Sequence, residues 1–201
     1  MDLFDQFTPP ENLLPYDGDV RYHGVVMGQG QADDFFRRLL EEIPWAHDEL
    51  VMFGRPVVTR RKVAWYGDQP FAYTYSRATK QALPWVPVLA ELKALVEQHS
   101  GERYNSCLLN LYHNGEETMG WHSDDEAELE KHGTIASLSL GAPRRFVFRH
   151  KQSKDQIKLM LEHGSLLVMK GTTQAFWQHS LPATKAVQTP RINLTFRTMV
   201  V

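Results

Sequence analysis

Six short strand-like runs, separated by turn residues, occupy the C-terminal half of this 201-residue chain. Such a rhythm of short strands and turns is typical of an antiparallel sandwich or barrel, such as a jelly roll. The earlier part of the chain has a different pattern and is expected to cover one side of this core. The six runs are 105–112, 135–140, 145–148, 157–161, 165–169 and 192–196.

Two amphipathic helices are predicted ahead of these runs. Apolar residues repeat at helical spacing from 35 to 43, just after two acidic residues, and again from 86 to 96, before Gly101. The opening segment reads as extended and irregular, and residues 20–27 alternate like a strand. We therefore expect an α+β fold, in which two helices buttress a jelly-roll core.

The composition fits one ordinary globular domain, with 42% apolar and 23% charged residues. No apolar run approaches the ~18 to 20 residues of a membrane span, and Asp2 and Asp5 replace the basic start of a secretory signal. We therefore expect no membrane partner, and a location in the cytoplasm at a bacterial nucleoid, or in a eukaryotic nucleus. The single cysteine, Cys107, lies in an apolar stretch and is expected to pack as a small hydrophobe.

Charge is unevenly distributed, although the net charge is only -2. The first 50 residues hold 3 basic against 11 acidic side chains, and the remainder holds 19 against 13. The basic part fits a nucleic-acid partner, but it fits a solvated face as well. Two basic clusters stand out: Arg55, Arg60, Arg61 and Lys62, then Arg144, Arg145, Arg149, Lys151 and Lys154.

A candidate metal site begins with His122 and Asp124. Two residues apart on an extended chain, their side chains leave the same face and can bind one ion, with His179 as a third ligand from another strand. Two histidines and one carboxylate leave three positions of an octahedral iron open for a bidentate cosubstrate and dioxygen. A His-x-Asp pattern also arises by chance, so further residues must support it.

That support comes from the tail of the chain, Pro190 to Arg197. Residues 191, 193, 195 and 197 alternate to one face, while Ile192, Leu194 and Phe196 face the other. Two arginines pointing into a barrel need an anionic guest or carboxylate partners, because unpaired buried charge costs several kcal/mol. A dicarboxylic acid such as 2-oxoglutarate fits that need; a solvated strand edge would also explain the arginines.

Together these motifs resemble the AlkB family of DNA and RNA dealkylating dioxygenases. The resemblance covers the chain from about residue 50 to its end, and is strongest to the branch that repairs double-stranded DNA. It divides the single domain into an N-terminal extension, helices and nucleotide-recognition lid, 1–103, and a jelly-roll dioxygenase core, 104–201. The motifs that carry it are 110–112, 122–126, 135–141, 145–149, 163–168, 179–182 and 191–197.

The resemblance implies an iron(II)- and 2-oxoglutarate-dependent reaction with dioxygen, for which ascorbate is the in vitro reductant. An alkyl carbon on 1-methyladenine or 3-methylcytosine is hydroxylated, and formaldehyde, succinate and carbon dioxide are released. Iron would be held by His122, Asp124 and His179, and 2-oxoglutarate by Asn110, Tyr112, Arg191, Thr195 and Arg197.

The resemblance also implies how a base would be taken out of its stack. Phe53, followed by Gly54 and Arg55, aligns with the hairpin whose phenylalanine wedges into duplex DNA; Phe53 packing in the core is the alternative. Arg61 and Lys62 would contact phosphates beside it, so reversing both charges should weaken DNA binding and flatten its salt dependence.

Base recognition is assigned, by resemblance, to two further segments. Tyr73-Thr74-Tyr75 would contact and stack on the base, with tyrosine at 75 where the relative carries phenylalanine. Asp125 and Glu126 would read its exocyclic group. For Glu126 the alternative is a solvated residue at the start of a short acidic helix.

Three other readings remain open at this point. An RNA or single-strand dealkylase would share every cofactor residue and differ in the finger. A catalytically silent lesion-binding module would lack an iron ligand or an arginine, and none is missing. A hydroxylase of another substrate class is opposed only by the aromatic pair and the basic clusters. We expect a monomer with DNA, most simply double-stranded, as partner.

Overall fold

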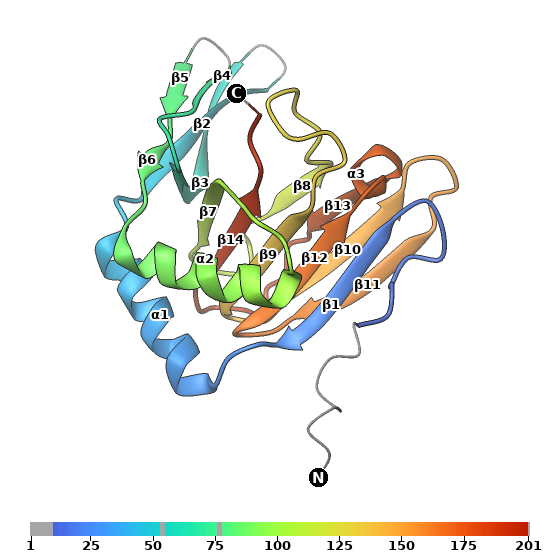
Figure 1. Ribbon diagram of the computed structural model, residues 1–201, viewed down its shortest axis with the longest axis horizontal. Helices are drawn as coiled ribbons and strands as arrows, with labels where there is room; N and C mark the ends of the chain where they lie inside the picture. Colours follow the sequence, from blue (N-terminus) through green and yellow to red (C-terminus); the bar gives the residue numbers. More distant parts are fainter. Residues whose placement is uncertain (1–9, 53–54, 76–77, 201) are drawn as a thin grey trace.

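The strand-like runs of the C-terminal half fold into two antiparallel sheets that share a core (Figure 1). The computed structural model of the protein describes residues 10–52, 55–75 and 78–200, with side chains except for 49–57 and 73–80. In the described chain the large sheet has the order β1 (Asp19–Val25), β12 (Ser165–Lys170), β9 (Ile135–Gly141), β14 (Arg191–Arg197), β7 (Ser106–Tyr112), β3 (Arg55–Gly67) and β2 (Ala46–Met52), and β6 (Leu83–Pro84) pairs with β3.

A smaller sheet and a hairpin complete the strands of the described residues. The small sheet has the order β11 (Gln156–Leu161), β10 (Arg144–His150), β13 (Trp177–Leu181) and β8 (Met119–His122). The hairpin pairs β4 (Ala72–Tyr75) with β5 (Ala78–Gln81). Among the described residues, all strand pairs are antiparallel except β3 with β6, which confirms the expected jelly-roll type of core.

Both predicted helices are present and lie on the outer face of the large sheet (Figure 1). Helix α1 (Gln29–Glu42) begins earlier than the acidic residues suggested, whereas α2 (Pro87–Ser100) has a proline in its first turn and ends at Gly101 with φ 74. Their apolar stripes pack against the outward side chains of β14, Ile192, Leu194 and Phe196, as the alternation predicted. None of the helices described is long and apolar enough to cross a membrane.

The second core lies between the two sheets and surrounds the inner face of β14. Phe146 and Phe148 of the small sheet and Leu167 and Met169 of the large sheet belong to one buried cluster. Because β14 alternates, its apolar side chains serve the helix-facing core and its polar side chains enter the space between the sheets.

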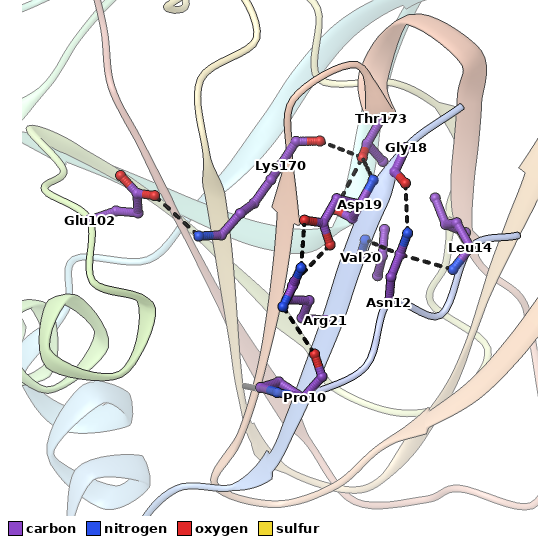
Figure 2. Close-up of polar contacts among 10 residues, drawn as sticks. All are labelled: Pro10, Asn12, Leu14, Gly18, Asp19, Val20, Arg21, Glu102, Lys170 and Thr173. Atoms are coloured by element: carbon purple, nitrogen blue, oxygen red, sulfur yellow. Dashed lines mark hydrogen bonds and ion pairs between the residues drawn. The ribbon is translucent and has the colours of Figure 1, made fainter. Parts of the chain in front are cut away.

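The segment ahead of β1 is irregular but closely tied to the rest of the molecule (Figure 2). The Asn12 side chain accepts hydrogen bonds from the backbone N–H groups of Leu14 and Val20 at 3.0 and 2.8 Å. The backbone N–H of Asp19 donates to Thr173 Oγ1 at 3.0 Å, at the start of α3 (Thr173–Phe176). Helix α3 leads directly into β13, so this segment supports a strand of the candidate site.

One predicted element is wrong. The acidic segment that begins at Glu126 forms turns, not a helix. Its backbone pairs with the end of the chain instead: the N–H of Glu130 donates to the carbonyl of Thr198 at 2.9 Å, and that of Val200 to Glu128 at 2.8 Å. Long-range backbone pairing therefore prevails over local helix propensity here.

Candidate metal centre and anion pocket

Three candidate ligands, His122, Asp124 and His179, converge at one edge of the small sheet. His122 on β8 and His179 on β13 are direct cross-strand partners, and Asp124 follows β8 by two residues. The Nε2 atoms of the two histidines lie 3.5 and 3.7 Å from Asp124 Oδ1, and one donor atom from each residue falls within 4.8 Å of the others. These separations exceed a hydrogen bond and leave room for an ion between the donors.

Neighbouring groups hold the three side chains in metal-binding form. His122 Nδ1 lies 2.9 Å from the carbonyl of Gly120, which can only accept, so Nδ1 carries the proton and Nε2 has a free lone pair. His179 stacks on Phe146, with ring centroids 5.3 Å apart. The backbone N–H of Asp124 donates to Gln174 Oε1 at 2.9 Å. The geometry therefore offers two imidazole nitrogens and one carboxylate from restrained side chains.

The protonation states suit the same purpose. Burial lowers the pKa of His122, and His179 acts in the same direction against the opposing effect of Asp124. Burial alone would raise the pKa of Asp124, but Arg197 and the two histidines outweigh it and hold that pKa well below its usual value. A neutral imidazole and an ionised carboxylate are the forms that bind a metal.

Behind this cluster lies a cavity between the sheets that contains the buried guanidinium of Arg191. Arg191 is 2% exposed and donates to two neutral oxygens, Ser139 Oγ at 2.9 Å and Asn193 Oδ1 at 2.7 Å. Its Nε has no partner among the described residues, and no described carboxylate forms an ion pair with it. Burial lowers the pKa of Arg191 to about 10. A buried cation in this condition fits an anionic guest such as a carboxylate.

The second arginine of β14 has a different environment. Arg197 Nε lies 3.2 Å from Asp124 Oδ2, and its Nη1 lies 3.8 Å from Glu126. Arg197 is therefore next to the metal cluster, whereas Arg191 has no carboxylate partner in the part of the chain that the structure describes. The sequence assigned both to one ligand, and the structure gives each a separate position in the same cavity.

The other residues predicted for the cosubstrate also line this cavity. The ring of Tyr112 has the Arg191 guanidinium 5.6 Å from its centroid, and Thr195 Oγ1 accepts from the side chain of Asn193 at 2.9 Å. Asn110 lies directly opposite Asn193, on β7. Asn193 was not among the predicted site residues, although its place on the polar face of the alternating tail was the signal that could have identified it.

The residues predicted to bind the base are only partly visible. Phe53 and Gly54 lie outside the described residues, and so do the side chains of Arg55, Tyr73, Thr74 and Tyr75. The neighbouring strands β2, β3, β4 and β5 lie together at one end of the molecule (Figure 1). Asp125 is 63% exposed with Lys151 at 3.8 Å, while Glu126 is part-buried beside Arg197.

Arg61 is placed differently from the expected phosphate contact. Its side chain is 12% exposed and donates to Asp48 at 2.9 Å and to Asn110 at 3.0 Å. The guanidinium is thus directed toward the inner face of the large sheet. Lys62, the next residue, is half-buried and forms no ion pair with the residues that the structure describes.

The fold and site together define a class: an antiparallel β-sandwich oxygenase whose iron is held by two histidines and one carboxylate. Family comparison is specific, because residues 18–197 match the 2OG-Fe(II) oxygenase superfamily. The chain belongs to this superfamily. Its members use iron(II), 2-oxoglutarate and dioxygen, in agreement with the cofactors expected from the sequence.

Individual relatives show which members of the superfamily this chain resembles. The chain is 42% identical to the alpha-ketoglutarate-dependent dioxygenase alkB homolog 3 of Bos taurus, over 84% of this chain and 62% of that protein. It is 41% identical to the DNA oxidative demethylase ALKBH2 of Mus musculus, over 96% of this chain and 85% of that one. The structure of OsALKBH1 has a TM-score of 0.61 at 18% identity, covers 92% of this chain and 98% of its own, and supports the fold. The chain therefore spans less than two thirds of some relatives.

Proposed function

We propose that this protein repairs alkylated DNA bases by oxidative demethylation, with 1-methyladenine and 3-methylcytosine as substrates. One observation carries the dioxygenase assignment: three convergent metal donors share a cavity with a buried arginine that has no carboxylate partner among the described residues. Support for DNA as substrate is similarity, over nearly the whole chain, to a protein named DNA oxidative demethylase.

The residues of the cavity divide the work. His122, Asp124 and His179 fit iron(II), and Arg191 with Asn110, Tyr112 and Thr195 fits a carboxylate end of 2-oxoglutarate. When bound with dioxygen, these cofactors supply the oxidising power that hydroxylates the alkyl carbon and leads to formaldehyde, succinate and carbon dioxide. The ion pair with Arg197 orients the carboxylate of Asp124. The apolar side chains of the core between the two sheets exclude water from the cavity.

We propose that the hairpins outside the two-sheet core bind the damaged base and present it to the metal site. We assign the stacking surface to Tyr73 and Tyr75 on β4 and the intercalating finger to Phe53 at the β2–β3 hairpin. With a finger at this position duplex DNA is the proposed substrate, and we propose a monomeric enzyme. Asp125 is exposed enough to contact a cationic methylated base, for which a carboxylate is electrostatically suited. The site of action would be wherever the cell holds its DNA, the nucleoid or the nucleus.

The deciding experiment is repair of 3-methylcytosine in matched single- and double-stranded oligonucleotides. Iron(II), ascorbate and 2-oxoglutarate are each omitted in turn, and formaldehyde is quantified. Cofactor-dependent repair that favours duplex is the expected result. Repair of single strands only would contradict the assignment of Phe53 as an intercalating finger but would still support the dioxygenase class. If 2-oxoglutarate is turned over while no oligonucleotide, DNA or RNA, is repaired, the substrate proposal is wrong.

A further inference from the structure

Arg61 lies at an irregularity in the pairing of β2 and β3. The ladder pairs His47 with Lys62 and resumes at Glu49 with Val58, so that residues 59–61 of β3 bulge opposite Asp48 alone on β2. Such bulges redirect side chains, and here the Arg61 guanidinium reaches Asp48 Oδ2 at 2.9 Å across the irregularity. Both side chains are nearly buried, at 12% and 11% exposure. The carboxylate neutralises the charge of Arg61 and holds it in place.

The Nε donor of this guanidinium determines the orientation of Asn110. Arg61 Nε lies 3.0 Å from Asn110 Oδ1, and a guanidinium can only donate. The side-chain oxygen of Asn110 must therefore face Arg61, and its NH₂ group must face away. An asparagine amide is otherwise ambiguous about which end is the donor.

The NH₂ group of Asn110 is directed to the cavity that contains Arg191. Asn110 lines that cavity, and its Nδ2 has no acceptor among the described residues. Its cross-strand partner Asn193 is different, because Asn193 Oδ1 accepts from Arg191 and Ser137, and its Nδ2 donates to Thr195. Of these two paired asparagines, Asn110 is the one with a donor left for a ligand.

We propose that Arg61 is a positioning residue for the cosubstrate: it holds the Asn110 amide so that Nδ2 donates to a carboxylate bound beside Arg191. This inference rests on the proposed role of the cavity as the 2-oxoglutarate site. It assigns Arg61 to cosubstrate affinity and not to a DNA phosphate. Because Asp48 lies on β2 and Arg61 on β3, their ion pair links the orientation of the Asn110 amide to the β2–β3 hairpin.

The test measures 2-oxoglutarate binding to the iron(II)-loaded protein by anaerobic calorimetry, with no nucleic acid present. Arg61→Met should weaken binding roughly tenfold, because a hydrogen bond to a charged ligand loses its fixed donor. In steady-state assays the KM for 2-oxoglutarate should rise while kcat at saturation is retained. Arg60→Met, at the exposed neighbouring arginine, is the matched control and should bind as the wild type does.

A double variant separates positioning from general support of the fold. In an Asn110→Ala background, Arg61→Met should cause no further loss of 2-oxoglutarate affinity, because the two residues act through one contact. Equal losses in both backgrounds, or a lower melting temperature with unchanged affinity, would overturn the proposal for Arg61. A wild-type protein that does not bind 2-oxoglutarate would overturn the cavity assignment itself. Failure of DNA repair alone would affect neither measurement.

Discussion

Two fully buried arginines show how the same side chain takes opposite roles in this molecule. Arg144 is 1% exposed and donates to the backbone carbonyls of Asn114, Gly115, Glu117 and Pro182 at 3.0–3.1 Å. Among the described residues, Arg191 donates only to two neutral side-chain oxygens, and no carboxylate forms an ion pair with it. Arg144 therefore joins two loops, and Arg191 remains available to an anion.

This difference predicts contrasting variants. Arg191→Met should weaken 2-oxoglutarate binding by roughly a hundredfold, because a charge-assisted pair is lost, and leave the ligand-free melting temperature unchanged or higher. Arg144→Met should lower the free energy of unfolding by about 3 kcal/mol, because several carbonyls lose their donor. Calorimetry and thermal melts on both proteins measure the contrast. If Arg191→Met were the destabilised variant, the two assignments would be reversed.

Asp124 is the residue on which the metal site depends most directly. Asp124→Ala should abolish turnover and reduce iron binding while the fold is retained, because it removes one of three donors at a site 7% exposed. Iron content and circular dichroism are the measurements. Demethylation at the wild-type rate by a folded Asp124→Ala protein would refute the metal assignment.

Among the elements, β8 carries a metal ligand although it is an edge strand of the small sheet. On its outer side the Arg149 guanidinium lies 4.0 Å from the centroid of Trp121, next to His122, and donates to Gln178 on β13 at 3.2 Å. Arg149 belongs to β10, so these contacts bridge three strands. They hold the edge strand against the neighbour that supplies His179.

Loss of this bridge should loosen the metal site. Trp121→Ala should reduce iron(II) affinity about fivefold, since a cation–π contact contributes about 1 kcal/mol, and should accelerate amide exchange at residues 119–122. Lys158→Met on β11, at the far edge of the same sheet, is the control. Unchanged exchange at β8 in Trp121→Ala would show that the bridge does not restrain the strand.

The periodicity of apolar residues was sufficient to predict secondary structure where the local pattern agrees with the packing. The helical spacing of α1 and α2 and the alternation of β14 each matched one buried face, so these elements were predicted. The helix predicted from Glu126 was wrong, because the structure of this acidic segment depends on pairing with residues 198–200. Arg61 could not be placed, since its direction is set by a bulge opposite another strand.

For the whole molecule, charge distribution separates DNA affinity from cosubstrate affinity. Lys62→Glu should weaken DNA binding and flatten its salt dependence by about one unit of slope, because one cation is replaced by an anion. Arg61→Met should leave that slope unchanged, because Asp48 already neutralises Arg61. Binding titrations at several salt concentrations, without cosubstrate, measure both. Equal slope changes would restore the phosphate contact first expected for Arg61.

The buried charge of Arg191 inside the sandwich has a consequence for how long the protein survives in a cell. A ligand that binds only the folded chain lowers the unfolded fraction in proportion to its saturation. Proteolysis acts on that fraction, so abundance follows stability. In cells short of 2-oxoglutarate, each enzyme molecule would therefore react more slowly, and the protein would also be less abundant. The supply of 2-oxoglutarate would then limit repair capacity through the rate at which the protein is degraded.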